Sequence, residues 1–244
     1  MKAVLNVMRR ELSGYFSTPV AWVFIVIFLV MSGIFTFYIG RFYERGSSDL
    51  DPFFQFHPWL YLFLVPAIAM RLWAEERRSG TIELLLTLPI TTGQAVLGKF
   101  LAAWLFIGIA LLLTFPVWIT VNYLGSPDNG VIVAGYIGSW LMAGGFLAIG
   151  ACMSALTRNQ VVAFILAVVV CFLFLLSGLP MVMDLFSGWA PQALLDTVAG
   201  FSFLSHFSTI SRGVIDLRDL VYFALVTGFW LVANAIVLEL RKAD

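Results

Sequence analysis

The chain has 244 residues, of which 61% are hydrophobic and only 11% are charged, and its mean hydropathy is +0.97. Soluble domains contain roughly 45–50% apolar residues, so this composition excludes an ordinary soluble protein. The 14 Lys and Arg residues equal the 14 Asp and Glu residues in number, and this balance gives no indication of nucleic-acid binding.

Six long stretches of the chain are nearly free of charge, and each is close to the roughly 20 residues that a helix needs to cross a bilayer. They are continuous and rich in Leu, Phe, Val and Ile, whereas the strands of a membrane barrel alternate in polarity. Lipid offers the backbone no hydrogen-bond partner, which leaves helices as the spanning elements. The sequence therefore predicts an all-α integral membrane protein with six transmembrane helices. The predicted spans are residues 20–40, 57–74, 94–122, 132–156, 160–179 and 219–239.

Lys and Arg are unevenly shared between the two sides of the predicted membrane domain. An even number of spans places both termini on one side, and that side holds ten of the fourteen cations. Because cytoplasmic segments carry the excess of Lys and Arg, both termini are predicted to be cytoplasmic. The inner cations are Lys2, Arg9, Arg10, Arg71, Arg77, Arg78, Lys99, Arg158, Arg241 and Lys242. The outer cations are Arg41, Arg45, Arg212 and Arg218.

Residues 1–16 are predicted to form an interfacial helix ahead of a six-helix domain of residues 17–244. Leu5, Met8 and Leu12 recur at helical spacing, and the opposite face is polar and basic. Such a helix lies along the inner membrane surface, the alternative being a solvated tail. We expect it to end at Gly14, before Thr18 and Pro19 begin the first span. Its candidate site residues are Arg9, Arg10 and Glu11.

Pro66 is expected to kink the second span. The loop that follows, residues 75–90, is the most polar inner segment of the chain. Ser79 or Thr81 can cap a short helix that Pro89 stops, and Thr91 with Gln94 forms a capping box for the third span. The loop is therefore predicted to be a compact protrusion on the inner face.

The fourth predicted span and the outer segment before the sixth span each have a distinct composition. The fourth span contains rows of small residues at four-residue spacing, such as Ser139, Ala143 and Ala151, which permit close helix packing. Residues 180–217 are apolar but too interrupted to span, and we expect short helices that re-enter the outer leaflet or cap the bundle. His206, Arg212 and Asp216 are the candidate site residues of this outer hairpin.

The sequence lacks a convincing catalytic, nucleotide or metal site. Residues 93–100 resemble a phosphate-binding loop, but Phe100 replaces the Ser or Thr that holds magnesium, and Lys99 is expected to extend to the lipid headgroups. His57 and His206 are expected to be interfacial, and Cys152 and Cys171 to be buried thiols without metal-ligand spacing. No charged side chain is expected deep within a span, which disfavours an ion-coupled carrier.

Taken together, the interfacial helix, the six spans, the loop Glu-Glu-Arg-Arg-Ser-Gly-Thr-Ile-Glu-Leu-Leu-Leu-Thr-Leu-Pro at 75–89 and the apolar hairpin resemble the permease subunit of type-2 ABC transporters. The resemblance covers essentially the whole chain. Within that family the loop and the segment from His206 to Asp219 are most similar to the gliding-motility-type permeases.

The resemblance implies that two permeases, identical or paralogous, pair in the bacterial inner membrane and dock on a dimer of separate ATPase subunits. ATP and magnesium would bind to those partners and not to this chain, which would not itself be an enzyme. An auxiliary periplasmic subunit and membrane lipid are further expected partners. The coupling helix that contacts the ATPase would lie at 75–88, with Glu76, Arg78, Thr81 and Glu83 as polar contacts. The full set of predicted coupling residues is Glu75, Glu76, Arg77, Arg78, Gly80, Thr81, Glu83, Leu84 and Leu85.

The main hypothesis from the sequence is thus the transmembrane subunit of an ABC exporter. An ATP-independent channel or secondary carrier is the first alternative, and a membrane scaffold or intramembrane enzyme is the second.

Overall fold

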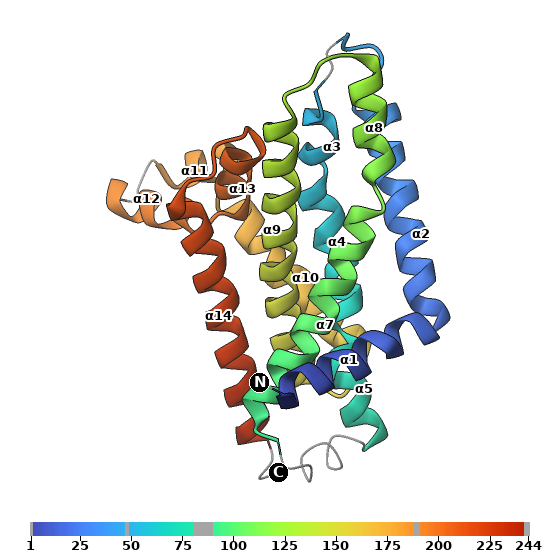
Figure 1. Ribbon diagram of the computed structural model, residues 1–244. Helices are drawn as coiled ribbons and strands as arrows, with labels where there is room; N and C mark the ends of the chain where they lie inside the picture. The colour runs from blue at the N-terminus through green and yellow to red at the C-terminus, as the bar shows by residue number, and fades with distance from the viewer. Residues whose placement is uncertain (1, 47–48, 81–89, 188–190, 242–244) are drawn as a thin grey trace.

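The computed structural model describes residues 2–46, 49–80, 90–187 and 191–241, and every regular element in these ranges is helical (Figure 1). The prediction of an all-α protein is therefore confirmed for the described part of the chain. The elements are α1 (Lys2–Ser17), α2 (Pro19–Gly33), the π-helical η1 (Ile34–Ile39), α3 (Asp51–Gln55), α4 (His57–Ala69), α5 (Arg71–Ser79), α7 (Thr92–Leu112), α8 (Phe115–Leu124), α9 (Asn129–Leu156), α10 (Gln160–Leu176), α11 (Pro180–Ser187), α12 (Gln192–Gly200), α13 (Phe203–Ser211) and α14 (Leu217–Leu240).

Four helical stretches of the described chain are long and apolar enough to cross a membrane: Pro19–Ile39, Thr92–Leu124, Asn129–Leu156 and Leu217–Leu240. Two predicted spans fall short of that length. α10 is apolar but has 17 residues, and the second predicted span is divided into α4 and α5 at Met70, four residues after Pro66. The structure thus supports a multi-pass membrane protein, while the number of six crossings stays a prediction.

The start of the first span differs in detail from the sequence prediction. α1 continues through Gly14 to Ser17, because a glycine within a helix costs only about 1 kcal/mol relative to alanine. Thr18 has the extended backbone of an N-cap residue, and Pro19 occupies the first turn of α2 as expected. The Thr18 hydroxyl does not cap α2, since it donates to the Tyr15 carbonyl of α1 at 3.0 Å.

α9 is the central helix of the bundle and packs against α4, α5, α7, α10, α13 and α14 (Figure 1). Small residues make these approaches possible: a Cβ atom at Gly145 would lie 2.5 Å from the Phe203 ring, and one at Gly150 would lie 2.4 Å from the Ala69 Cβ atom. Ser139, Ala143 and Ala151 are at most 1% exposed, which confirms the close packing that their spacing predicted.

α7 and α9 are joined by a reciprocal tryptophan pair. The indole nitrogen of Trp104 donates to the Trp140 carbonyl at 2.9 Å, and that of Trp140 donates to the Trp104 carbonyl at 3.1 Å. The rings stack with centroids 4.1 Å apart, and each ring covers a glycine of the facing helix, Gly144 under Trp104 and Gly108 under Trp140. Both indole donors are thereby satisfied inside an apolar bundle, where an unpaired donor would be costly.

Replacing Gly144 with Ala should destabilise this α7–α9 contact by about 1–3 kcal/mol, because overpacking forces neighbouring groups apart. The new Cβ atom would lie 2.9 Å from the Trp104 indole nitrogen. Thermal unfolding of the purified protein, followed by tryptophan fluorescence, measures the loss. Gly228→Ala in α14 is the matched control, since a Cβ atom there meets nothing within 4 Å. Equal stability of the two variants would contradict the packing role of Gly144.

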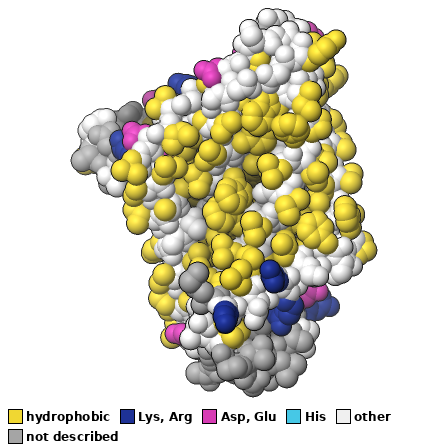
Figure 2. Space-filling view, viewed as in Figure 1, with side chains coloured by type: hydrophobic (Ala, Val, Ile, Leu, Met, Phe, Trp, Pro, Cys, Tyr) yellow, Lys and Arg dark blue, Asp and Glu magenta, His cyan; other side chains and the backbone are white. Residues whose placement is uncertain are grey.

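The two ends of the bundle carry different elements. α1, α5 and the end of α14 lie at one end, and α3, α8, α11, α12 and α13 lie at or towards the other (Figure 1). Hydrophobic side chains cover the middle of the visible face, and the charged side chains gather above and below this belt (Figure 2). This distribution matches an apolar bilayer core between two polar boundaries.

Candidate functional site

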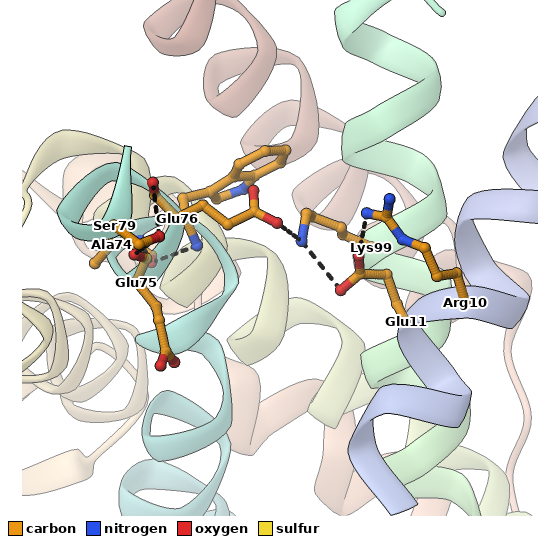
Figure 3. A network of polar contacts seen from close by, with 9 residues as sticks. Arg10, Glu11, Ala74, Glu75, Glu76, Ser79 and Lys99 are labelled. Atoms are coloured by element: carbon orange, nitrogen blue, oxygen red, sulfur yellow. Dashed lines mark hydrogen bonds and ion pairs between the residues drawn. The ribbon is translucent and has the colours of Figure 1, made fainter. Parts of the chain in front are cut away.

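The end of the bundle that carries α1 and α5 contains an ion cluster centred on Lys99 (Figure 3). Its ammonium Nζ lies 3.0 Å from Glu11 Oε2 of α1 and 2.7 Å from Glu76 Oε1 of α5. The Lys99 side chain is 4% exposed and also lies 5.3 Å from the Trp73 ring centroid. The expectation that Lys99 extends to the lipid headgroups is therefore wrong, because two carboxylates hold its ammonium inside the protein.

Local structure explains why these three helices meet at Lys99. The predicted capping box is present: the Thr91 side chain accepts from the Gln94 backbone, and the Gln94 side chain accepts from Thr91 N, which begins α7 two turns before Lys99. Gly98 lets α1 approach closely, since a Cβ atom there would lie 2.7 Å from Val7. The ring of Tyr15 then stacks on Phe106 at 5.1 Å and secures the other end of α1.

Glu11 is shared by two cations. Arg10 donates to its Oε1 at 2.9 Å, while Lys99 contacts its Oε2. Burial by itself would raise the pKa of Glu11, but the positive charges of Lys99 and Arg10 outweigh burial and hold the pKa below its ordinary value of 4.5. Glu11 is therefore ionised at neutral pH and links α1 to α7.

α5 is anchored on α9 by a hydroxyl that the sequence prediction missed. Ser154 Oγ accepts hydrogen bonds from the backbone nitrogens of Trp73 at 3.1 Å and Ala74 at 3.0 Å, and it donates to the Met70 carbonyl at 2.8 Å. These are the backbone groups at the break between α4 and α5. Arg77 adds a hydrogen bond from Nη1 to the Ala155 carbonyl. The orientation of α5 is thus determined by α9.

The predicted coupling residues occupy different environments. Glu76 is directed at Lys99, and Glu75 is directed away from it and accepts from Arg71 Nε at 2.8 Å (Figure 3). The hydrogen bond and charge of Arg71 lower the pKa of Glu75. Arg78 is exposed, and Gly80 ends α5 with a left-handed φ of 72°. Thr81, Glu83, Leu84 and Leu85 lie outside the described residues. Of the three candidate residues on α1, Arg9 and Arg10 are exposed and Glu11 is directed into the bundle.

Comparison with known proteins identifies the family. The sequence matches the family described as "ABC-2 family transporter protein" over residues 5–238. The chain belongs to the ABC-2 transporter family. It is also similar to the probable ABC transporter permease protein NosY of Stutzerimonas stutzeri, at 31% identity over 120 residues. That alignment covers 47% of this chain and 44% of the relative, so the chain matches less than half of the relative's length. The recognition of an ABC transporter permease from the sequence is confirmed.

The end of this ABC-2 protein opposite α1 and α5 contains a second polar cluster, in which His206 of α13 contacts Asp219 of α14. His206 Nδ1 lies 2.5 Å from Asp219 Oδ1, and its Nε2 lies 3.1 Å from the Gly200 carbonyl. Both ring nitrogens thus face oxygen atoms that can accept a hydrogen bond. The His206 ring stacks on Tyr222 at 3.9 Å, and the Tyr222 hydroxyl donates to the Phe201 carbonyl.

The other outer residues singled out from the ABC-2 sequence are more peripheral. Arg212 is exposed just after α13, and Asp216 caps α14 by accepting from Arg218 N at 3.1 Å. Asp219, the buried partner of His206, was missed. Its position after an Asp-Leu-Arg sequence is typical of an exposed helix start, and only the fold shows that it faces α13.

Three further expectations concern possible chemistry of the ABC-2 chain. Residues 93–100 lie within α7 and are helical. They do not form the loop whose backbone N–H groups would bind a phosphate. His57 is 0% exposed and packs against Phe53 at 4.4 Å, so it is a core residue and the prediction of an interfacial position is wrong. Cys152 and Cys171 are buried thiols, as expected, and within the described ranges no group of three His, Cys, Asp or Glu residues could hold a metal ion.

Proposed function

We propose that this chain is the transmembrane subunit of an ABC exporter in the bacterial inner membrane, and that ATP with magnesium is hydrolysed on a separate dimer of ATPase subunits. A second permease, identical or paralogous, would complete the transport path, and an auxiliary periplasmic subunit would be a further partner. Membership in the ABC-2 family and the similarity to an ABC transporter permease favour this function over an ATP-independent channel or carrier.

The observation that carries the proposal is the ion cluster of Glu11, Glu76 and Lys99. It joins α1, α5 and α7 at the point where the chain leaves α5 for residues 81–89 and returns at α7. A force applied to that loop would reach α5 and α7 directly, because the loop connects them, and α1 through the two ion pairs. This is the mechanical arrangement that a coupling segment at 75–90 needs.

The proposed topology has six crossings, a cytoplasmic interfacial helix at α1, and an outer hairpin at 180–217 that shapes the exit. α1 has a polar, exposed side with Arg9 and Arg10 and a side that packs on α7 through Val7. α11, α12 and α13 are short helices at the opposite end of the bundle, between α10 and α14 (Figure 1). Both features support the proposed arrangement relative to the membrane.

Glu83→Arg tests the coupling role. Reversing a charge in the loop should reduce co-purification of the ATPase subunit about tenfold, because like-charge contacts at an interface cost more than 1 kcal/mol. Folding should be unaffected, as judged by the thermal unfolding of the permease alone. Glu239→Arg supplies the control, since this exposed residue lies at the end of α14 and outside the loop. Undiminished ATPase binding by Glu83→Arg would remove the coupling assignment.

Labelling of single introduced thiols tests the orientation. The native thiols are at most 3% exposed, so they give little background. In intact cells, a membrane-impermeant maleimide should label Tyr123→Cys, at an outer position that is 89% exposed, and should not label Ser79→Cys until the cells are opened. Labelling of Ser79→Cys in intact cells would place α5 on the external side and end the proposal.

A further inference from the structure

A cavity of about 410 Å³ lies between α1, α2, the α4–α5 junction and α7. It is within the roughly 300–1,000 Å³ range of small-molecule sites. One part of its wall is apolar and comes from α2 and α4, including Val23, Ile27 and Ala67. The other part is formed by charged side chains, among them Arg71 and Glu75. The cavity is therefore amphipathic, with its charged part next to the Lys99 cluster.

The apolar wall opens towards the surroundings of the protein. Val20, Val23 and Ile27 line the cavity and are also 51%, 54% and 42% exposed. They belong to Pro19–Ile39, one of the stretches that can cross a membrane. In a bilayer, this side of α2 faces lipid acyl chains, so an acyl chain can enter the cavity from the side without passing through water.

The charged part offers hydrogen-bond donors for a phosphate. Arg71 uses Nε for Glu75, and its terminal Nη groups have no hydrogen-bond partner among the residues that the structure describes. Its side chain is 32% exposed, so the guanidinium is accessible. A guanidinium binds phosphate oxygens through two parallel hydrogen bonds, which a lysine ammonium cannot do. Lys99 is unavailable because Glu11 and Glu76 already hold it.

The net charge of the residues that line the cavity determines which lipid headgroup fits. The lining contains three carboxylates and two cations, which leaves one net negative charge. An anionic lipid would add a second negative charge next to these carboxylates. A zwitterionic headgroup brings its own cation, and Glu75, whose side chain is 46% exposed, lies beside Arg71 and can accept from an ammonium.

We infer that this cavity binds one inner-leaflet phosphatidylethanolamine, with its phosphate on Arg71, its ammonium on Glu75 and an acyl chain along α2. The lipid is a resident component that fills the space between α1 and α2, and the inference does not depend on what the protein transports. It goes beyond the proposed function because the lipid site would be present whatever substrate the transporter carries.

The test is retention of lipid by the full-length permease. The purified protein is delipidated, incubated with an equimolar mixture of phosphatidylethanolamine and phosphatidylglycerol, and analysed by native mass spectrometry. The wild type should retain about one phosphatidylethanolamine per chain. Ala67→Trp fills the cavity, and Arg71→Gln removes charge-assisted hydrogen bonds to phosphate, so each should lower retention about tenfold. Val26→Trp, on the exposed face of α2 outside the cavity, should retain the lipid as the wild type does.

Two comparisons decide the identity of the ligand. Glu75→Gln should shift binding from phosphatidylethanolamine towards phosphatidylglycerol, because it replaces the carboxylate that pairs with the ammonium by a neutral amide and so removes one negative charge from the lining. Equal retention by Ala67→Trp and the wild type, equal loss in Val26→Trp, or a wild-type preference for phosphatidylglycerol would each overturn the inference. If Ala67→Trp is less stable than the wild type in thermal unfolding, Val23→Trp takes its place, since it fills the same cavity from α2.

Discussion

Lys99→Met is expected to destabilise the protein by about 3 kcal/mol and to release α1 from α7. The substitution keeps the length of the side chain but removes the cation that bridges Glu11 Oε2 and Glu76 Oε1. Removing one partner of a buried ion pair costs roughly 3–5 kcal/mol, and the lower end applies because the two Glu side chains are 19% and 20% exposed and Arg10 still pairs with Glu11. Thermal unfolding in detergent measures the stability, and hydrogen exchange of residues 2–17 measures the release of α1.

Two further variants separate charge from packing at Lys99. Lys99→Arg keeps the charge and should retain most of the stability. The triple variant Lys99→Met with Glu11→Gln and Glu76→Gln also removes the two carboxylate charges and should regain part of the loss. If Lys99→Met alone unfolds at the wild-type temperature, the ion cluster does not hold α1.

The same cluster makes α1 sensitive to acid. The pKa of Glu11 is lower in the folded protein than its ordinary value of 4.5, so its contribution to stability is complete above pH 4.5. The contribution is lost as the pH falls below 4.5 and through the lower folded value. Lys99→Met removes the charge and hydrogen bond of Lys99 that lower the pKa of Glu11, so this pKa rises relative to the wild type and the acid-induced exchange of α1 should begin at higher pH.

Asp219→Ala is the second substitution with a large expected effect, a destabilisation of about 3 kcal/mol at the end of the bundle that carries α13. The side chains of His206 and Asp219 are 9% and 7% exposed, so the remaining imidazole would be buried with an unpaired ring nitrogen, which costs about 1–3 kcal/mol, next to the space that the truncation leaves. α13 would lose its polar link to α14 and retain the aromatic contacts of Phe203. Hydrogen exchange should therefore increase at residues 203–211 and stay unchanged at residues 2–17.

Two other substitutions give losses of stability with which the loss in Asp219→Ala can be compared. Asp219→Asn keeps a side chain that can hydrogen-bond to His206 and should cost about 1 kcal/mol. Asp216→Ala removes only the cap of α14 and should also cost about 1 kcal/mol. A loss in Asp219→Ala no greater than in Asp216→Ala would show that the buried pair does not stabilise the contact between α13 and α14.

The elements with local signals were predicted well from the sequence. The first, fourth and sixth predicted spans agree with Pro19–Ile39, Asn129–Leu156 and Leu217–Leu240 to within about three residues at each end, because length and hydropathy are properties of the segment itself. The capping box of Thr91 and Gln94 was predicted for the same reason, since its partners are three residues apart.

Contacts between distant segments could not be read in this way. Lys99 was expected at the headgroups because its own span is apolar, and its partners at positions 11 and 76 meet it only in the folded bundle. Ser154 is one of many small residues in α9, and nothing local distinguishes it from Ser139. The break at Met70 follows from that tertiary contact and not from Pro66 alone.

α9 contacts both ends of the molecule without an intervening loop. Ser154 holds the break between α4 and α5, and Gly138 and Gly145 receive Ile210 and Phe203 of α13. Ser154 lies sixteen positions after Gly138, which corresponds to about 24 Å at the helical rise of 1.5 Å per residue. A straight, tightly packed rod of this length resists compression, so an axial displacement imposed at Ser154 arrives at α13 almost undiminished.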